Sequence, residues 1–267
     1  MLEYKVIPLM YSANDKFHNT IRVGVVTKEL INKEIFKKAV EIGMKRYPYF
    51  SVKLKEENEK YIMLFNDADF VVSENGKAVC LGSEEANEHL VAFSFNEKTF
   101  YIDISHFITD GTGVIPLVKT IAYYYFLYKY NTIDVCTDRI NLFGDEISWD
   151  EEAYPYPTQP LQVEKLFPKK DNVEDVYVID KKEFDAFGCY AYYVKVKQTD
   201  LLKQSKNNDG SPVSYLSVML NKTICNLNED ITQNIICTVP HQYRQILNRP
   251  LSQKSKFIAS LSYDNSE

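Results

Sequence analysis

The order of apolar and polar positions predicts that strands and helices alternate along the first 130 residues. Residues 20–27 are rich in β-branched side chains, which favour an extended strand. From Asn32 onward the apolar period is that of an amphipathic helix, and Tyr47-Pro48 ends it. The apolar positions that recur on one face of this helix are Ile35, Phe36, Ala39, Val40, Gly43 and Met44. We expect this face to pack on a sheet.

Further short strands are predicted on both sides of that helix. In chain order they are residues 4–9, 50–55, 61–65, 70–72, 90–95 and 99–105. Turns rich in Glu, Asn and Asp separate the middle three, which indicates a meander. In the last strand three apolar residues alternate with Tyr101, Asp103 and Ser105, the pattern of a half-buried strand. His106 therefore stands at a strand end.

A second helix follows a glycine-containing turn at residues 110–113. Residues 114–128 carry apolar side chains at helical spacing, and Pro116 falls in the first turn, where a missing N–H costs little. The simplest interpretation of this apolar stripe, including the tyrosines at 123–125, is core packing.

The remainder of the chain predicts a crossover and then a second unit. Residues 143–175 mix prolines with charges and lack periodicity. The elements expected after them are a strand at 190–197, a short helix capped by Thr199, a turn at 207–210, a helix from Ser211-Pro212 to about 227, and a strand at 235–239. The predicted domains are residues 1–145, a linker at 146–176, and residues 177–267.

The composition of the chain argues against several classes of protein. The chain has 31 basic and 37 acidic residues, which gives a formal net charge of −6. A negative net charge argues against a nucleic-acid-binding protein. The most apolar stretch, residues 115–130, contains two lysines and is shorter than the roughly 20 residues of a membrane span. Charges near the amino end interrupt any secretory signal, so we expect a cytoplasmic protein. Five scattered cysteines without a CxxC pair, and no HExxH or EF-hand spacing, predict reduced thiols and no metal site.

One segment, residues 105–111 (SHFITDG), contains candidate catalytic residues. His106 ends a strand, and imidazole is the side chain that accepts a proton near neutral pH. Asp110 stands where the next helix begins, and so could cap that helix or hold a cation. Gly111 allows a sharp turn. Taken alone, the pattern is short, and a histidine at a strand end is more often structural than catalytic.

The segment resembles the HxxxDG motif of the chloramphenicol acetyltransferase-like superfamily, which includes alcohol acetyltransferases, acyl-CoA-dependent acyltransferases and condensation domains. Residues 45–50 (KRYPYF) resemble the end of the family's early helix. The helix at 211–225 is similar to the one that opens the family's second half, and residues 236–244 (ICTVPHQYR) look like the strand that follows it. The four features occur in the family's order.

The resemblance implies an α/β fold with a mixed sheet and flanking helices, and direct acyl transfer from acyl-CoA. His106 would be the general base that takes a proton from a hydroxyl or amine acceptor. Asp110 would face away from the substrate and pair with an arginine, for which Arg244 is the matching residue; Gly111 would belong to the same scaffold. Acyl-CoA would be a co-substrate, with no further cofactor.

The sequence also departs from the family. Ser105 replaces the second histidine of condensation domains, which favours a free-standing acyltransferase. Family members are longer and have two similar halves around a tunnel, whereas no second-half Asp-Phe-Gly-Trp-Gly motif is found here, and Trp149 lies in the crossover. We therefore expect a complete first half and a truncated second half, in a fragment or in a chain that needs another chain to complete the tunnel.

Two other functions stay open at this point: a catalytically silent binding module, and a condensation-type domain that uses carrier-protein thioesters. A hydrolase triad is disfavoured because Ser105 and His106 are neighbours on a strand and point to opposite faces. The other histidines, His18, His89 and His241, are interpreted as surface or hydrogen-bonded polar residues.

Overall fold

The computed structural model describes residues 19–58, 60–132, 134–152, 176–177, 194–228, 231–235, 237, 239–240 and 260–261. The described residues up to Glu152 belong to one compact unit, and those from Val176 onward belong to a second. The predicted strand at residues 4–9 lies outside the described residues. The domain boundaries at 145 and 176 stay predictions.

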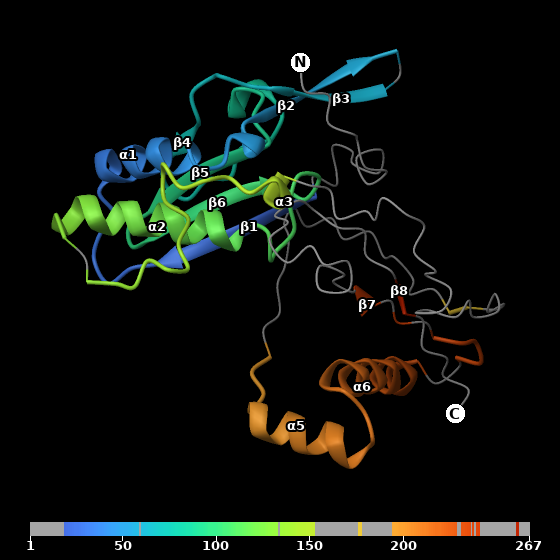
Figure 1. Ribbon diagram of the computed structural model, residues 1–267. Coiled ribbons are helices and arrows are strands. Elements are labelled where there is room, and N and C mark those ends of the chain that lie inside the picture. Colours follow the sequence, from blue (N-terminus) through green and yellow to red (C-terminus); the bar gives the residue numbers. More distant parts are fainter. Residues whose placement is uncertain are drawn as a thin grey trace. The chain divides into compact units, whose positions relative to one another are not determined.

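The first unit has a mixed α/β fold built on a four-stranded sheet, in the order β1-β6-β5-β4 (Figure 1). Its strands are β1 (Thr20–Val26), β4 (Val72–Ser73), β5 (Val91–Asn96) and β6 (Thr99–Ser105). The pairs β1–β6 and β5–β6 are antiparallel, whereas β4 runs parallel to β5, so the sheet is mixed. Because β1 and β6 pair in register, the first strand of the sheet lies beside the strand that leads to His106.

Two helices, α1 (Lys33–Met44) and α2 (Ile115–Tyr130), lie side by side across one face of the sheet (Figure 1). The predicted cap of α1 is confirmed, because the Asn32 side chain accepts a hydrogen bond from the Ile35 N–H at 3.0 Å. The Phe36 ring lies 4.9 Å from the Phe100 ring of β6, so the apolar face of α1 packs on the sheet as expected. The fully buried core of the unit includes Phe36, Tyr47, Phe50, Phe93, Phe100, Ile102, Ile104, Leu117, Ile121 and Tyr125.

The alternation predicted for β6 is only half right. Phe100, Ile102 and Ile104 are buried as expected, yet Asp103 and Ser105 of the other face are each only 2% exposed. The carboxyl end of β6 is therefore buried on both faces, so its polar side chains require hydrogen-bond partners.

The meander predicted for residues 50–72 does not form. The strands β2 (Val52–Glu57) and β3 (Lys60–Phe65) make a separate two-stranded sheet, and β4 joins the main sheet instead. The single helical turns at Pro48–Phe50 and Glu84–Ala86 flank these strands. Alternation of side chains predicts the individual strands but does not say which strands pair.

The second unit contains α5 (Gln198–Asn207), α6 (Pro212–Leu227) and the short pair β7 (Val239–Pro240) and β8 (Ser260–Leu261). The predicted cap of α6 is confirmed, because the Ser211 hydroxyl accepts from the Ser214 N–H at 3.1 Å. Thr199 is not the cap of α5: it lies inside the first turn, and the cap residue Lys197 makes no side-chain cap bond.

The strand predicted at 190–197 is not formed by its described part. Residues 194–197 form no strand, and Val194 is 85% exposed. Pairing needs a neighbouring strand, which the local sequence pattern cannot supply.

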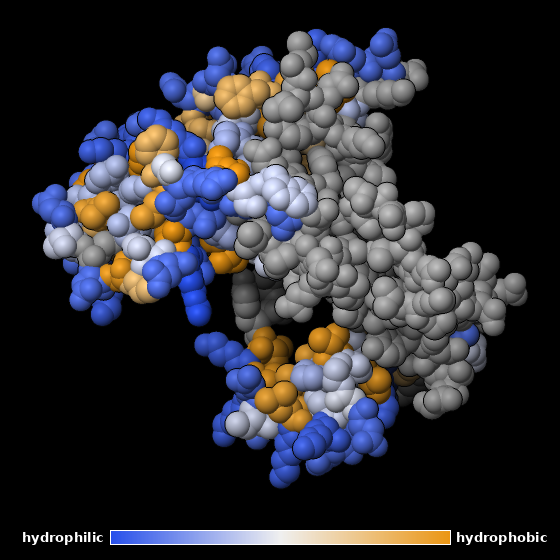
Figure 2. All heavy atoms as spheres, in the orientation of Figure 1, coloured by the Kyte–Doolittle hydropathy of each residue, from blue (hydrophilic) through white to orange (hydrophobic). Residues whose placement is uncertain are grey.

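Helix α6 exposes apolar side chains and buries polar ones. Ser217 and Asn221 are buried, whereas Val213, Leu216 and Leu220 are each about half exposed; apolar side chains are visible on the surface over α5 and α6 (Figure 2). None of the described helices is both long and apolar enough to cross a membrane.

Candidate functional site

His106 follows directly after the last residue of β6. Its backbone N–H donates to the carbonyl oxygen of Asn19 at 2.9 Å, next to the start of β1, so two adjacent strands fix the position of its backbone. The three residues after it, Phe107, Ile108 and Thr109, are buried, whereas His106 itself is partly exposed. The histidine is thus held by a rigid backbone without being sealed in the core.

Ser105 has a structural role in the same turn. Its hydroxyl accepts a hydrogen bond from the Phe107 N–H at 3.3 Å, and its carbonyl accepts from the Ile108 N–H at 3.2 Å. These bonds turn the chain away from the sheet immediately after His106. They also give the buried hydroxyl a backbone partner that is not His106.

Asp110 caps the turn that leads into α2. Its carboxylate oxygen Oδ1 accepts from the Thr112 N–H at 3.0 Å and from the Gly113 N–H at 2.8 Å, and its carbonyl accepts from the Val114 N–H. Arg244 lies outside the described residues, so its ion pair with Asp110 stays a prediction.

The conformational role expected of Gly111 is wrong. Its backbone does not adopt the left-handed conformation, and a Cβ atom built there would meet no atom within 4 Å. The turn is formed instead by the hydrogen bonds to Asp110. These bonds are compatible with any residue type at position 111.

An ion pair between the partly exposed Arg22 and the buried Asp103, which the sequence did not single out, lies three residues before His106. Arg22 of β1 donates from Nε and Nη2 to the two carboxylate oxygens of Asp103, each at 2.7 Å. Arg22 also donates to the Gly76 carbonyl at 3.0 Å, and its guanidinium carbon lies 4.8 Å from the centre of the Tyr101 ring. The hydrogen bond to Asp103 is the main cause that raises the pKa of Arg22. The pair joins β1 and β6 just before the strand that carries His106 ends.

A second ion pair, which is buried, uses Arg46, one of the residues that carry the family resemblance. Its two terminal nitrogens donate to the two carboxylate oxygens of Glu151, at 3.0 and 2.9 Å, and the Tyr49 hydroxyl donates to the same carboxylate at 3.1 Å. Glu151 belongs to the short helix α3 (Trp149–Glu152). The end of α1 and α3, about 100 residues apart, are therefore tied together inside the first unit.

Among the described residues, no three histidine, cysteine or acidic side chains are grouped as metal ligands would be. Of the four residues that the sequence proposed for the site, the structure describes His106, Asp110 and Gly111, which share one turn. The signal that could have indicated Asp103 is its position among the polar residues of β6, but its partner depends on the register of β1.

No family model and no curated protein matches the sequence. Solved structures match part of it. The starter condensation domain of rhizomide synthetase RzmA has a TM-score of 0.36 and 12% identity, and covers 45% of this chain and 34% of its own length. The epimerization domain of tyrocidine synthetase B has a TM-score of 0.39 and 14% identity, and covers 50% of this chain and 36% of its own length.

One further structure is a variant of the rhizomide synthetase domain in complex with C8-CoA, with a TM-score of 0.36 and 12% identity over 43% of this chain. The match takes in about a third of the length of each of these structures. A likeness at this TM-score and identity assigns neither a fold family nor an activity.

Proposed function

We propose that this chain carries the general-base histidine of an acyltransferase, which moves an acyl group, with acetyl as the first choice, from acyl-CoA to a hydroxyl or amine acceptor. The observation that carries the proposal is the arrangement of residues 105–111. His106 is partly exposed at the end of β6, its backbone is bonded to Asn19, and Asp110 caps the turn that follows.

In the proposed reaction, the acceptor hydroxyl or amine loses its proton to the His106 imidazole as it attacks the thioester carbonyl. The tetrahedral intermediate then collapses, the C–S bond breaks, and the imidazolium returns the proton to the departing thiolate. Acyl-CoA and acceptor give acylated acceptor and free CoA, so no oxidant, reductant or metal is required. General-base assistance is typically worth about 10²- to 10⁴-fold in rate.

The hydrogen bonds of the junction support this role because a general base has to keep a fixed position relative to two substrates. Ser105 and Asp110 bond to backbone N–H groups of the residues that follow His106, and His106 itself is partly exposed. The proposed ion pair from Asp110 to Arg244 would further fix the same turn.

The test measures release of the CoA thiol from acetyl-CoA with a panel of alcohols and amines. We expect His106→Ala to lower the rate by about 10²- to 10⁴-fold without a change in unfolding midpoint. Lys119→Ala, at an exposed position of α2, is the matched control and should keep the wild-type rate. Equal rates for His106→Ala and the wild type would exclude His106 as the base.

Two results would favour the alternatives. If the wild type neither binds CoA nor releases thiol, a silent binding module is favoured. If acyl groups on a carrier protein are used and acyl-CoA is not, the condensation-type reaction replaces the one proposed.

A further inference from the structure

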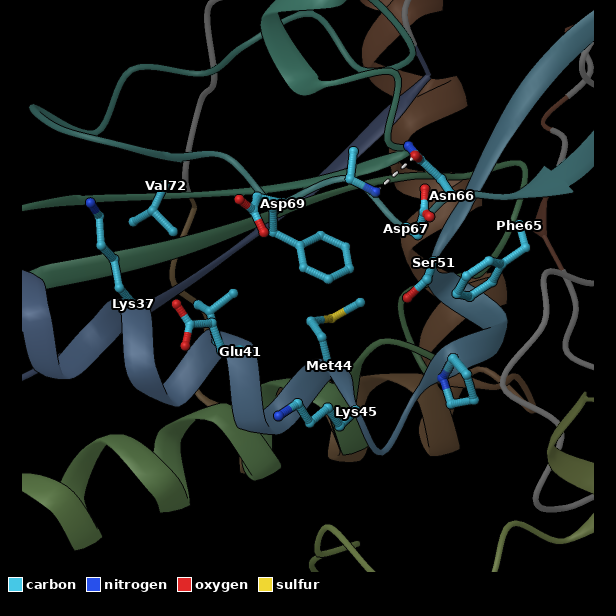
Figure 3. Close-up of a pocket in the computed structure, with 14 residues that line it drawn as sticks. Lys37, Glu41, Met44, Lys45, Ser51, Phe65, Asn66, Asp67, Asp69 and Val72 are labelled. Carbon is cyan, nitrogen blue, oxygen red and sulfur yellow. Dashed lines mark hydrogen bonds between the residues drawn. The ribbon is translucent and has the colours of Figure 1, made fainter.

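A groove lies between α1 and the segment at residues 65–72 (Figure 3), and no residue of the turn that carries His106 lines it. Its volume is about 610 Å³, within the range of small-molecule sites. One wall is a single face of α1, formed by Lys37, Val40, Glu41, Met44 and Lys45; Pro48, Ser51 and residues 65–70 and 72 complete the lining.

The wall opposite α1 is held in place by side-chain bonds. The Phe70 ring stacks on the buried His89 ring at 4.2 Å, and His89 Nε2 lies 2.7 Å from the Ala68 carbonyl. Asn66 donates to the Asn87 carbonyl at 2.8 Å, and Asn87 donates to the Asp69 carbonyl at 2.8 Å. The groove is therefore preformed, which lowers the entropic cost of binding a ligand.

Two lysines, Lys37 and Lys45, line the groove, and neither forms an ion pair with a carboxylate of the groove. The ammonium of Lys45 lies 5.9 Å from the centre of the Phe143 ring. The charge of Lys37 acts on Glu74, which already binds Lys33.

By contrast, three carboxylates, those of Glu41, Asp67 and Asp69, form no ion pair with any residue that the structure describes. Glu41 and Asp69 lie on opposite walls of the groove (Figure 3).

The hydroxyl of a mostly buried residue, Ser51, is a second feature of the groove that suits a ligand. Ser51 is only 7% exposed, and its backbone N–H and carbonyl are bonded to Pro48 and Asn66. Its hydroxyl makes no hydrogen bond with any described residue and points into the groove (Figure 3). Among the described residues, the buried side-chain atoms without a partner do not include Ser51 Oγ, so this hydroxyl is accessible from the groove and can bond to a polar group of a ligand.

We propose that this groove binds a small amphipathic amine that carries a second polar group at its far end. The ammonium group lies between the carboxylates of Glu41 and Asp69, the hydrocarbon part packs on Val40, Met44 and Phe70, and the far polar group bonds to the Ser51 hydroxyl. The proposal requires no chemistry at His106 and stands apart from the proposed acyl transfer.

Three related probes separate these contacts. Tyramine carries an ammonium group, an aromatic ring and a phenolic hydroxyl; 2-phenylethylamine lacks the hydroxyl, and 4-ethylphenol lacks the ammonium group. Isothermal titration of the full chain measures each dissociation constant. We expect tyramine to bind most tightly, with a loss of roughly fivefold or more when either polar group is missing, because each forms a hydrogen bond in a partly buried site.

Variants assign each loss to a side chain. Glu41→Gln and Asp69→Asn should each weaken the two amines by roughly fivefold and leave 4-ethylphenol unchanged. Ser51→Ala should make tyramine and 2-phenylethylamine equal. Glu56→Gln, which removes an exposed charge of β2 outside the groove, is the control and should change nothing.

The proposal is overturned if tyramine does not bind, if the three probes bind equally, or if Glu56→Gln weakens the amines as much as Glu41→Gln does. His106→Ala should retain the wild-type affinity for tyramine. Failure of the amine site and failure of the acyl transfer are therefore told apart by separate measurements.

Discussion

Arg46 and Glu151 show how strongly burial changes the consequence of losing a charge. Their side chains are 3% and 8% exposed, whereas those of the surface pair Lys55 and Glu57 are about half exposed. Removal of one partner from a buried pair leaves an uncompensated charge, whereas an exposed charge is solvated by water. The Arg46–Glu151 pair therefore fixes α3 to the first unit.

We predict that Glu151→Ala lowers the free energy of unfolding by about 3 to 5 kcal/mol. The matched control, Glu57→Ala, should lower it by about 1 kcal/mol or less. Urea denaturation followed by circular dichroism measures both. Equal losses for the two variants would contradict a stabilising buried pair.

The tyrosine next to Arg46 makes stability depend on alkaline pH. Burial raises the pKa of Tyr47 to about 12, so the folded protein keeps a proton that the unfolded chain loses from about pH 10. The stabilisation is complete below pH 10 and is lost as the pH rises from 10 to 12, by about 2 to 3 kcal/mol.

The prediction for Tyr47→Phe is a smaller loss of stability between pH 10 and 12 than in the wild type, measured by urea denaturation at each pH. An unchanged pH profile in this variant would show that Tyr47 does not contribute. Burial raises the pKa of Tyr49 as well, so part of the dependence should persist.

At the scale of elements, close packing of α1 on α2 depends on one glycine. A Cβ atom at Gly43 would lie 2.9 Å from Cγ1 of Ile121, a distance that requires a shift of one helix or side chain. Gly111, in contrast, has open space around it and an ordinary backbone conformation. The sequence pattern predicts Gly43 on the apolar face of a helix and Gly111 in a turn, but it does not indicate which of the two limits packing.

We therefore expect Gly43→Ala to lower the free energy of unfolding by about 1 to 3 kcal/mol, because overpacking outweighs the gain in helix propensity. Gly111→Ala should stay within about 0.5 kcal/mol of the wild type. Thermal and urea unfolding of both variants test the pair, and a larger loss for Gly111→Ala than for Gly43→Ala would refute it.

The elements that could be predicted from the sequence are those defined by local signals. The caps Asn32 and Ser211 depend on nearby residues, and the structure confirms both. The apolar face of β6 is confirmed as well, whereas the polar face predicted at Asp103 and Ser105 is buried. The Arg22–Asp103 pair and the separation of β2–β3 from the main sheet depend on which strands pair across tens of residues. The spacing of apolar residues along the chain does not determine which strands pair. The candidate site shows the same limit, since His106 and Asp110 are close in sequence and Arg244 is not.

For the molecule as a whole, the first unit has a continuous core, whereas the second exposes apolar side chains along α6. In the first unit, the ion pairs Arg22–Asp103 and Arg46–Glu151 join segments that are far apart in sequence, one of them beside the strand that carries His106. The proposed catalytic turn is thus part of the first unit, whose described residues share this continuous core.

The central claim is that the His106 imidazole itself takes the acceptor's proton. Chemical rescue tests it most directly: thiol release from acetyl-CoA is measured for His106→Gly as imidazole is added, with a protein-free reaction to subtract direct attack by imidazole. We expect imidazole to restore part of the lost rate in this variant and to leave the rate of the wild type unchanged. A variant that folds, binds acetyl-CoA and stays inactive at every imidazole concentration would contradict it.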